Sequence, residues 1–153
     1  MMLELVTTEP LLSTARAIFR EYQEGLGIDL GYQGFATELS TLPGKYAPPK
    51  GRLYLAFAGQ IPAGCVALRP LTKGRCEMKR LYVRPAFRGQ KTGRLLADRV
   101  IADARQIGYR QMFLDSLVTM TAAQQLYRSL GFREIPPYGG HAASGTVFMG
   151  LDL

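Results

Sequence analysis

The sequence predicts a mixed α/β fold with a mostly antiparallel central sheet and helices on both faces. Two observations carry this prediction. Between residues 52 and 83, three apolar segments follow one another with only short turns between them, which is typical of antiparallel strands. A segment of helical periodicity then separates the strand-like segments 80–83 and 112–115, which indicates a parallel pair joined by a right-handed crossover.

The first half of the chain supplies a strand, two helices and the three antiparallel strands. Pro10 lies near the start of the first helical segment, and Gly25 and Gly27 follow its end, as is typical of helix boundaries. We expect, in order, a strand in 3–8, a helix in 9–27, a shorter helix within 32–42, a surface loop over 43–51, two strands in 52–71 joined by a turn at 58–62, and a strand in 75–83.

The second half is expected to alternate strands and helices. Gly108 and Gly131 mark the ends of its two helices. The apolar positions of the long helix follow a helical period, namely Leu96, Ala97, Val100, Ile101, Ala104 and Ile107. The remaining expected elements are a strand in 111–117, a helix in 121–131, and two strands in 132–138 and 146–153 around a Gly-rich loop.

Composition narrows the class of protein. Hydrophobic residues make up 47% and charged residues 20% of the 153 residues, as in a folded globular protein. No apolar run approaches the roughly 20 residues that cross a bilayer, and the N-terminus lacks the features of a signal peptide. We therefore expect a single domain over residues 1–153 in the cytoplasm, with Cys65 and Cys76 as buried free thiols.

The formal net charge of +7 invites a nucleic-acid hypothesis. The basic residues are dispersed, however, and no extended stripe of them is visible. Their densest group is Lys79, Arg80, Arg84, Arg88, Lys91 and Arg94. A compact polyanionic ligand explains this concentration at least as well as a duplex does, because a duplex needs extended phosphate contacts.

Residues 82–100, YVRPAFRGQKTGRLLADRV, run from a strand through a Gly-framed basic loop into a helix. A helix N-terminus presents unpaired N–H groups and positive partial charge, and glycines beside it let a phosphate reach the main chain. An ordinary turn can have a similar composition, and the loop matches neither a Walker A motif nor G-x-G-x-x-G. The clear strand before it and helix after it favour a phosphate-binding loop.

Residues 76–109, followed by 112–117 and 122–134, resemble the GNAT superfamily of N-acetyltransferases. The family's loop pattern, Arg/Gln-x-x-Gly-x-Gly/Ala, is matched by Arg88, Gly93 and the spacing between them. Residues 126–132, LYRSLGF, are similar to the family's second signature. The order of elements fits along nearly the whole chain, whereas the N-terminal half is less diagnostic.

The resemblance implies acetyl-coenzyme A as donor, with its pyrophosphate on the loop amides and its pantetheine arm along residues 80–83. The central sheet would then contain a parallel pair splayed at the cofactor site, where residues 80–83 separate from 113–116. The implied cofactor-binding residues are Leu81, Tyr82, Val83, Arg88, Gly89, Gln90, Lys91, Thr92, Gly93 and Arg94.

Lys91 departs from the family pattern, which usually has Gly at this position. If close approach of the phosphate requires that Gly, the lysine Cβ could crowd it. If the position is already helical, Lys costs little and adds a cation, which is the interpretation that we favour.

Acetyl transfer to an amine needs a deprotonated amine, a stabilised oxyanion and a proton for the departing thiolate. Tyr127 lies on an apolar helical stripe, so spacing alone favours a core tyrosine; its match to the family's "LY" position implies a catalytic acid. The family often has Asn where Met120 stands, so one polar cofactor contact is expected to be missing. The backbone N–H groups near Leu81–Val83 are implied to stabilise the oxyanion.

Glu77 corresponds to a carboxylate that some members of the family use as base. A salt bridge or a solvent-facing position on the strand explains this residue nearly as well, and many enzymes of this fold use a water chain as base instead. Strand alternation predicts that Glu77, Lys79, Leu81 and Val83 share the face of the cleft, unless a bulge interrupts the strand.

Other ionisable residues carry weaker signals. His141, the only histidine, lies in a Gly-rich loop and is either solvated or in contact with the acceptor. The N-terminal helical region could meet a cationic amine, or could simply be surface, through Glu21, Glu24, Asp29, Tyr32 and Glu38. One His and two separated Cys offer no metal-ligand spacing, so no metal is expected.

The sequence therefore predicts an acetyl-CoA-dependent N-acetyltransferase that acts on a primary amine of a small molecule or peptide by direct attack in a ternary complex. The alternative is a non-catalytic acyl-CoA-binding sensor or regulatory module of the same fold. We expect neither membrane nor nucleic acid as a partner, and a homodimer is compatible with exposed C-terminal strands.

Overall fold

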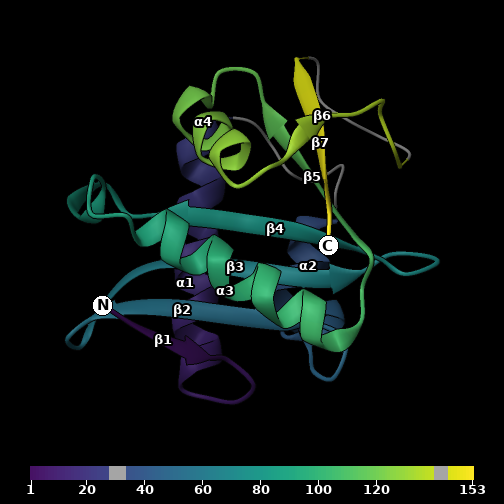
Figure 1. Cartoon of the computed structure of the whole chain (residues 1–153). Helices are drawn as coiled ribbons and strands as arrows, with labels where there is room; N and C mark the ends of the chain where they lie inside the picture. The colour runs from purple at the N-terminus through teal and green to yellow at the C-terminus, as the bar shows by residue number, and fades with distance from the viewer. Residues whose placement is uncertain (28–33, 140–144) are drawn as a thin grey trace.

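The computed structural model of the chain describes residues 1–27, 34–139 and 145–153. Within these ranges, seven strands form one sheet in the order β1-β2-β3-β4-β5-β7-β6 (Figure 1). The strands are β1 (Met2–Leu5), β2 (Arg52–Ala58), β3 (Ile61–Pro70), β4 (Arg75–Val83), β5 (Gln111–Leu117), β6 (Arg133–Glu134) and β7 (Thr146–Asp152). The helices are α1 (Leu11–Leu26), α2 (Phe35–Thr41), α3 (Thr92–Ile107) and α4 (Thr121–Ser129), with short 3-10 helices η2 (Gly44–Tyr46) and η3 (Pro85–Phe87).

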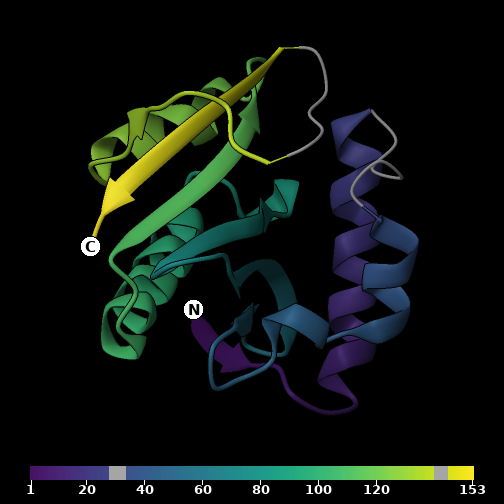
Figure 2. The ribbon, with the colours of Figure 1, turned by 90° about the vertical axis from the view of Figure 1, so that its right-hand side faces the viewer.

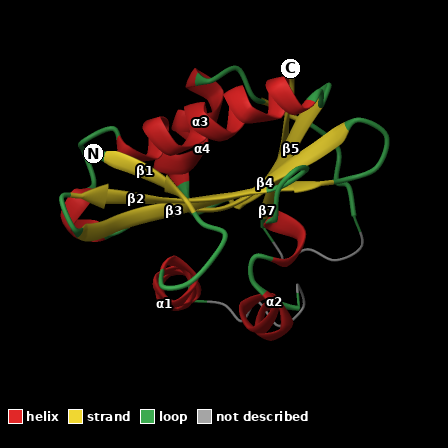
Figure 3. Ribbon diagram, turned by 90° about the horizontal axis from the view of Figure 1, so that it is seen from below, coloured by secondary structure: helices red, strands yellow, loops and turns green. Residues whose placement is uncertain are grey.

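The predicted mixed sheet is confirmed. All neighbouring strands pair antiparallel except β4 and β5, which are parallel and joined through α3. The helices cover both faces of the sheet, with α1 and α2 on one side and α3 and α4 on the other (Figure 2; Figure 3).

Each helical layer buries its own core against the sheet. On the α1 face, Phe19 packs in one cluster with Leu53 and Leu55 of β2. On the α3 face, Leu96 packs in a second cluster with Leu68 of β3. All of these side chains are fully buried, because alternate residues of the central strands point to opposite helical layers.

The parallel pair separates partway along its length. β4 pairs with β5 only over Arg75–Glu77 against Gln111–Phe113, although β4 continues to Val83 and β5 to Leu117. Figure 1 shows the two strands diverging beyond this point. The backbone groups of β4 that face this gap therefore have no partner in β5. The predicted splay is confirmed.

A bulge in β4 overturns the predicted strand alternation. Cys65 pairs with Tyr82 and Ala67 with Lys79, so that two residues of β4, Arg80 and Leu81, lie opposite one residue of β3. Arg80 adopts a left-handed conformation with φ 60°. A bulge of this kind adds one residue to the strand and reverses the facing of the residues after it.

The predicted common face of Glu77, Lys79, Leu81 and Val83 is therefore wrong. Leu81 and Val83 pack against the α3 core, whereas Glu77 and Lys79 line a cavity on the α1 and α2 face.

The other differences from prediction concern element ends. α1 continues through Gly25 and ends at Leu26, with Gly27 as its C-cap at φ 70°. The strand expected over 132–138 is only Arg133–Glu134, because two prolines follow shortly and cannot donate to the ladder.

Cys65 and Cys76 are buried and free, as expected. Among the described residues, every helix is too short or too polar to span a bilayer.

Candidate active site

The loop after β4 brings unpaired N–H groups to the start of α3. The first helical hydrogen bond is donated by the Leu95 N–H to the Lys91 carbonyl, at 3.0 Å. The N–H groups of Thr92, Gly93 and Arg94 precede this bond, so they have no acceptor within the helix. They also carry the positive partial charge of the helix N-terminus.

Thr92 adds an unpaired side-chain group at the same place. Its side chain is 2% exposed, and its Oγ1 is the one buried side-chain polar atom without a hydrogen-bond partner in the described part of the chain. Burying a hydroxyl without a partner costs free energy that a ligand oxygen would recover. Gly89, in the same loop, has φ +80°, a conformation that side chains rarely adopt.

The basic side chains of the loop have different environments. The Nε of Arg88 donates to the Val83 carbonyl at 3.0 Å, and Nη1 of Arg94 donates to the Ser129 hydroxyl at 2.9 Å. Lys91 is exposed and caps α3 with φ 62°, so the assumption that this position is helical is wrong. The left-handed conformation explains why Gly suits this position.

A cavity of about 920 Å³ extends from this loop along the end of β4 to the start of α4. Every residue that the sequence assigned to the cofactor lines this cavity except Gln90. Opposite them lie the lining residues Tyr22, Gly25, Leu26, Leu117, Thr119, Met120, Thr121, Ala122, Ala123 and Leu126. Met120, at the position where the family often has Asn, is the N-cap of α4 and makes no side-chain capping bond.

Tyr127 lies behind this cavity, on α4. Its side chain is 6% exposed and packs edge-on against Phe132, with 5.8 Å between ring centroids. Burial raises the pKa of the Tyr127 phenol well above its usual value, and the nearby Tyr22 and Asp115 act in the same direction. The phenol therefore keeps its proton at neutral pH, and its hydroxyl makes no hydrogen bond to a described residue.

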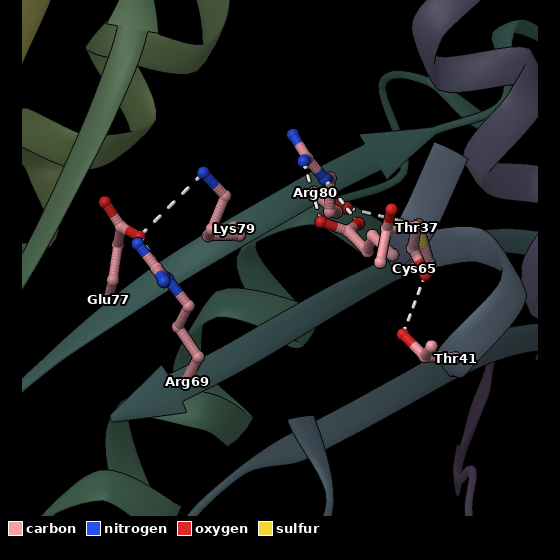
Figure 4. Close-up of polar contacts among 8 residues, drawn as sticks. Thr37, Thr41, Cys65, Arg69, Glu77, Lys79 and Arg80 are labelled. Atoms are coloured by element: carbon pink, nitrogen blue, oxygen red, sulfur yellow. Dashed lines mark hydrogen bonds and ion pairs between the residues drawn. The ribbon is translucent and has the colours of Figure 1, made fainter. Parts of the chain in front are cut away.

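A second cavity, of about 990 Å³, lies on the face covered by α1 and α2. Strands β4 and β5 line both cavities. In β4, Lys79 and Arg80 line the second cavity and Leu81 lines the first; in β5, Asp115 lines the second cavity and Leu117 the first. Its ionisable lining residues in the described ranges are Glu38, Lys45, Tyr46, Arg69, Arg75, Glu77, Lys79, Arg80, Asp115 and Tyr138. Figure 4 shows several of these side chains gathered over β3 and β4.

Glu77 is the most buried carboxylate of this cavity. Its Oε1 accepts from Arg69 Nε at 2.7 Å and lies 3.8 Å from Lys79 Nζ (Figure 4). Its Oε2 accepts from the Tyr138 hydroxyl at 2.6 Å. Burial alone would raise the pKa of Glu77. The charges of Lys79 and Arg69, together with hydrogen bonds from Tyr138 and Arg69, outweigh burial and lower that pKa.

Asp115 is a carboxylate that the sequence reasoning did not single out. It is half-buried on β5, two residues beyond Phe113 and therefore inside the splayed gap. It forms no hydrogen bond or ion pair with a described residue. Burial raises the pKa of Asp115, although Lys79 acts in the opposite direction. An acidic residue within the otherwise apolar strand QMFLDSL was the available signal.

The other predicted acceptor residues fall into three groups. Glu21 is paired with Arg84, with hydrogen bonds of 3.0 and 2.9 Å, and Glu38 is paired with Arg80, at 2.8 and 2.9 Å. Glu24 is exposed. Asp29, Tyr32 and His141 lie outside the described residues. In the part of the chain that is described, no cluster of three or more His, Cys, Asp or Glu side chains could hold a metal ion.

The fold and the two cavities define an α/β protein in which a loop with free N–H groups lies beside a splayed parallel pair. Comparisons with known proteins agree with this class. Residues 15–132 match the Acetyltransferase (GNAT) family. An uncharacterized N-acetyltransferase of Schizosaccharomyces pombe is 40% identical over 144 residues, which are 93% of this chain and 88% of that protein.

Solved structures share the fold over the full length. A GNAT-family acetyltransferase of Staphylococcus aureus superposes with a TM-score of 0.82 at 20% identity, with 99% of each chain covered. The PaiA N-acetyltransferase of Thermoplasma acidophilum, solved in complex with coenzyme A, superposes with a TM-score of 0.71 at 17% identity over 100% of both chains. The chain belongs to the GNAT family of acetyltransferases.

Proposed function

We propose that the chain is an N-acetyltransferase that moves the acetyl group of acetyl-CoA to a primary amine of a small molecule or peptide. One observation carries the proposal: both cavities are lined by residues of β4 and β5, and they meet at the place where these strands separate. One cavity holds the anion-binding loop, and the other holds ionisable side chains suited to an amine.

The first cavity fits coenzyme A. The free N–H groups of Thr92, Gly93 and Arg94 and the unpaired Thr92 Oγ1 would hold the pyrophosphate, and exposed Lys91 would add a cation. The free edge of β4 at Leu81–Val83 offers backbone donors and acceptors to the pantetheine amides. Bound acetyl-CoA would supply the acetyl group as a thioester.

The chemistry forms a C–N bond and breaks a C–S bond. The amine nitrogen attacks directly, without an acetylated enzyme, and loses one proton to a base, while the departing thiolate takes one proton from an acid. The N–H groups of Leu81–Val83 would stabilise the oxyanion. Tyr127 would supply the proton to the thiolate: its phenol is neutral, although the pKa raised by burial makes it a weaker acid than an ordinary tyrosine.

Two carboxylates compete for the role of base. Glu77 was predicted for it, but both of its oxygens already accept hydrogen bonds and its pKa is lowered, which weakens it as a proton acceptor. Asp115 has no such partner among the described residues, lies in the gap and has a raised pKa. These properties favour Asp115 as base and a positioning role for Glu77.

The experiment is a thermal-shift titration with acetyl-CoA, followed by detection of free thiol in the presence of an amine panel. At about 100 times its dissociation constant, the donor should stabilise the fold by about 2.7 kcal/mol. Stabilisation without thiol release from any amine would favour the non-catalytic sensor. No thermal shift at millimolar donor would contradict the proposal as a whole.

A further inference from the structure

We propose that the acceptor amine carries a carboxylate, and that Arg69 and Arg75 bind this carboxylate at the end of the second cavity farthest from Leu81–Val83. The inference rests on the proposed acetyl transfer and specifies its acceptor.

Arg69 presents an unused half of its guanidinium to the cavity. Its Nε is engaged by Glu77 at 2.7 Å, but its Nη1 and Nη2 donate to no residue in ranges 1–27, 34–139 and 145–153. The side chain is 27% exposed, so these two nitrogens lie in a partly desolvated position. A planar guanidinium with two free donors matches a carboxylate in bidentate geometry.

Arg75 lies beside Arg69 on the same face. Arg69 pairs with Glu77 across β3 and β4, and Arg75 is two residues before Glu77, so the two arginine Cβ atoms are diagonal neighbours about 7 Å apart. Arg75 Nε donates to Gln111 at 3.2 Å, and its guanidinium lies over the Phe113 ring at 5.4 Å. Its Nη1 and Nη2 likewise have no acceptor among the described residues.

The charge balance of the cavity supports an anionic group. Five cations and three carboxylates line it within the described ranges. Glu38 is fully used by Arg80, and Glu77 is shared between Arg69 and Lys79. If the charge of Asp115 is counted against Lys79, none of the described lining carboxylates is left for Arg75 or for Lys45. A purely cationic acceptor would add positive charge where an excess already exists.

The arrangement also orients the ligand. Arg75 lies at the start of β4, where β4 and β5 still pair, whereas Asp115 lies beyond the last pair, in the gap. Phe113 lies between them on β5 and packs against Tyr138, with 5.0 Å between ring centroids. A carboxylate at the arginines would direct the amine of the same molecule along Phe113 toward Asp115.

Matched acceptors test the inference. Thiol release from acetyl-CoA is measured with β-alanine and β-alaninamide, with phenylalanine and phenylalaninamide, and with phosphoethanolamine. We expect kcat/KM to be roughly 10-fold higher for each acid than for its amide, as charge-assisted hydrogen bonds would give. A preference for the acid is diagnostic. The ammonium group of the amide loses its proton more readily than that of the acid, so without a carboxylate site the amide would react faster.

Arginine variants connect the preference to the proposed residues. Arg75→Gln should reduce the acid-to-amide ratio of kcat/KM roughly 10-fold, and Arg75→Lys, which keeps the charge but not the fork, should give an intermediate ratio. Arg69→Gln should act in the same direction but also disturbs Glu77, so Arg75 is the primary site. Arg105→Gln on the exposed face of α3 removes the same charge elsewhere and should keep the wild-type ratio.

Each other outcome is decisive. Three results would overturn the carboxylate inference while leaving acetyl transfer intact. They are equal kcat/KM for the amides and the acids, an acid-to-amide ratio that does not change in Arg75→Gln, and a higher kcat/KM for phosphoethanolamine than for the carboxylic acids. Thiol release from no amine would overturn the proposed function, and the inference with it.

Discussion

Tyr127 combines a buried ring with a hydroxyl that makes no hydrogen bond to a described residue. Thr92 Oγ1 is the one buried side-chain polar atom without a partner in the described ranges, so the Tyr127 hydroxyl, unlike its ring, keeps some contact with solvent or a cavity. The ring contact with Phe132 accounts for the packing, and it leaves the hydroxyl unexplained. Proton donation to a ligand would explain why the hydroxyl is retained.

Tyr127→Phe separates the two roles. It keeps the ring and the Phe132 contact, so the thermal midpoint and the acetyl-CoA affinity should change little. Turnover should fall by roughly 10²-fold, because the proton donor is lost. Steady-state kinetics and a melting curve on the same preparation measure both. A lower melting temperature with a normal rate per folded molecule would support a core role instead.

The two carboxylates of the second cavity respond oppositely to pH. The pKa of Asp115 is raised in the folded state, so its ionised form weakens the fold at neutral pH, and this effect vanishes below its unfolded pKa. The pKa of Glu77 is lowered, so its ionised form stabilises the fold at neutral pH, and that contribution is lost as pH falls through the folded pKa.

Asp115→Asn and Glu77→Gln should therefore diverge. At pH 7, Asp115→Asn should raise the melting temperature, whereas Glu77→Gln should lower the free energy of unfolding by about 2 kcal/mol because it leaves Arg69 and Lys79 without their carboxylate. Both differences should shrink below pH 4. In the pH–rate profile, the base variant should lose most activity at low pH and recover partly as pH rises. If Glu77→Gln loses most activity at low pH and recovers partly as pH rises, and Asp115→Asn keeps the wild-type rate, then Glu77 is the base.

Lys91 and Lys73 allow the free-energy cost of a lysine in the left-handed conformation to be compared inside and outside the cofactor loop. Both are non-glycine residues with positive φ, 62° and 57°, but Lys73 lies in the turn between β3 and β4, outside both cavities. Gly at either position should stabilise the fold by up to about 1 kcal/mol in a melting experiment.

Only Lys91→Gly removes a cation from the cofactor loop. Its acetyl-CoA affinity should change less than about fivefold, because the lysine is exposed and its charge is screened. An affinity gain in Lys91→Gly that is absent from Lys73→Gly would show that the lysine obstructs the phosphate.

At the scale of elements, the order of strands and helices along the chain, the parallel pair and the long helices followed from the sequence. Apolar periodicity and Gly or Pro at element ends are local signals, and they were sufficient there. The bulge at Arg80 was not predictable, because no local pattern shows that one residue of a strand will turn left-handed. Its cause is tertiary: Arg80 is buried beneath α2, where it is paired with Glu38 and lies over the rings of Tyr22 and Phe35.

The same limit applied to the candidate site. The phosphate loop was found because its glycines and basic residues are contiguous in the sequence. Asp115, Arg69 and Arg75 were missed because they come from three strands, and only the sheet register brings them to one cavity.

The Arg80–Glu38 pair should anchor α2 to β4. The two side chains are 2% and 15% exposed and form a bidentate pair, so Glu38→Gln should cost about 3 kcal/mol of unfolding free energy. Hydrogen exchange should show the loss of protection mainly in α2. Glu21→Gln is the control, because its pair with Arg84 is about one-third exposed and should contribute less than about 1 kcal/mol. Equal losses in both variants would contradict this anchoring role.

For the whole molecule, the net charge is +7, and eight basic but only three acidic side chains line the two cavities in the described ranges, which suits a polyanionic donor and an anionic acceptor. Raising the salt concentration from 50 to 300 mM should therefore weaken binding of acetyl-CoA, as measured by calorimetry, because screening acts on these exposed cations. Desulfo-coenzyme A should show the same salt dependence, since it keeps the phosphates. A salt-independent dissociation constant would contradict electrostatic capture.

The homodimer stays a prediction, to be measured by sedimentation.

The separation of β4 from β5 also has a mechanical meaning. Three residue pairs form the only ladder between a block of strands β1–β4 and a block β5–β7–β6, so this line is the natural hinge of the sheet in the described ranges. Both cavities open on the two sides of that line. A small rotation of one block against the other would change the width of both cavities together. A donor bridging the gap would therefore act on the width available to the acceptor, and reciprocity requires that any change it makes in acceptor affinity be matched by an equal factor in its own affinity when the acceptor is bound.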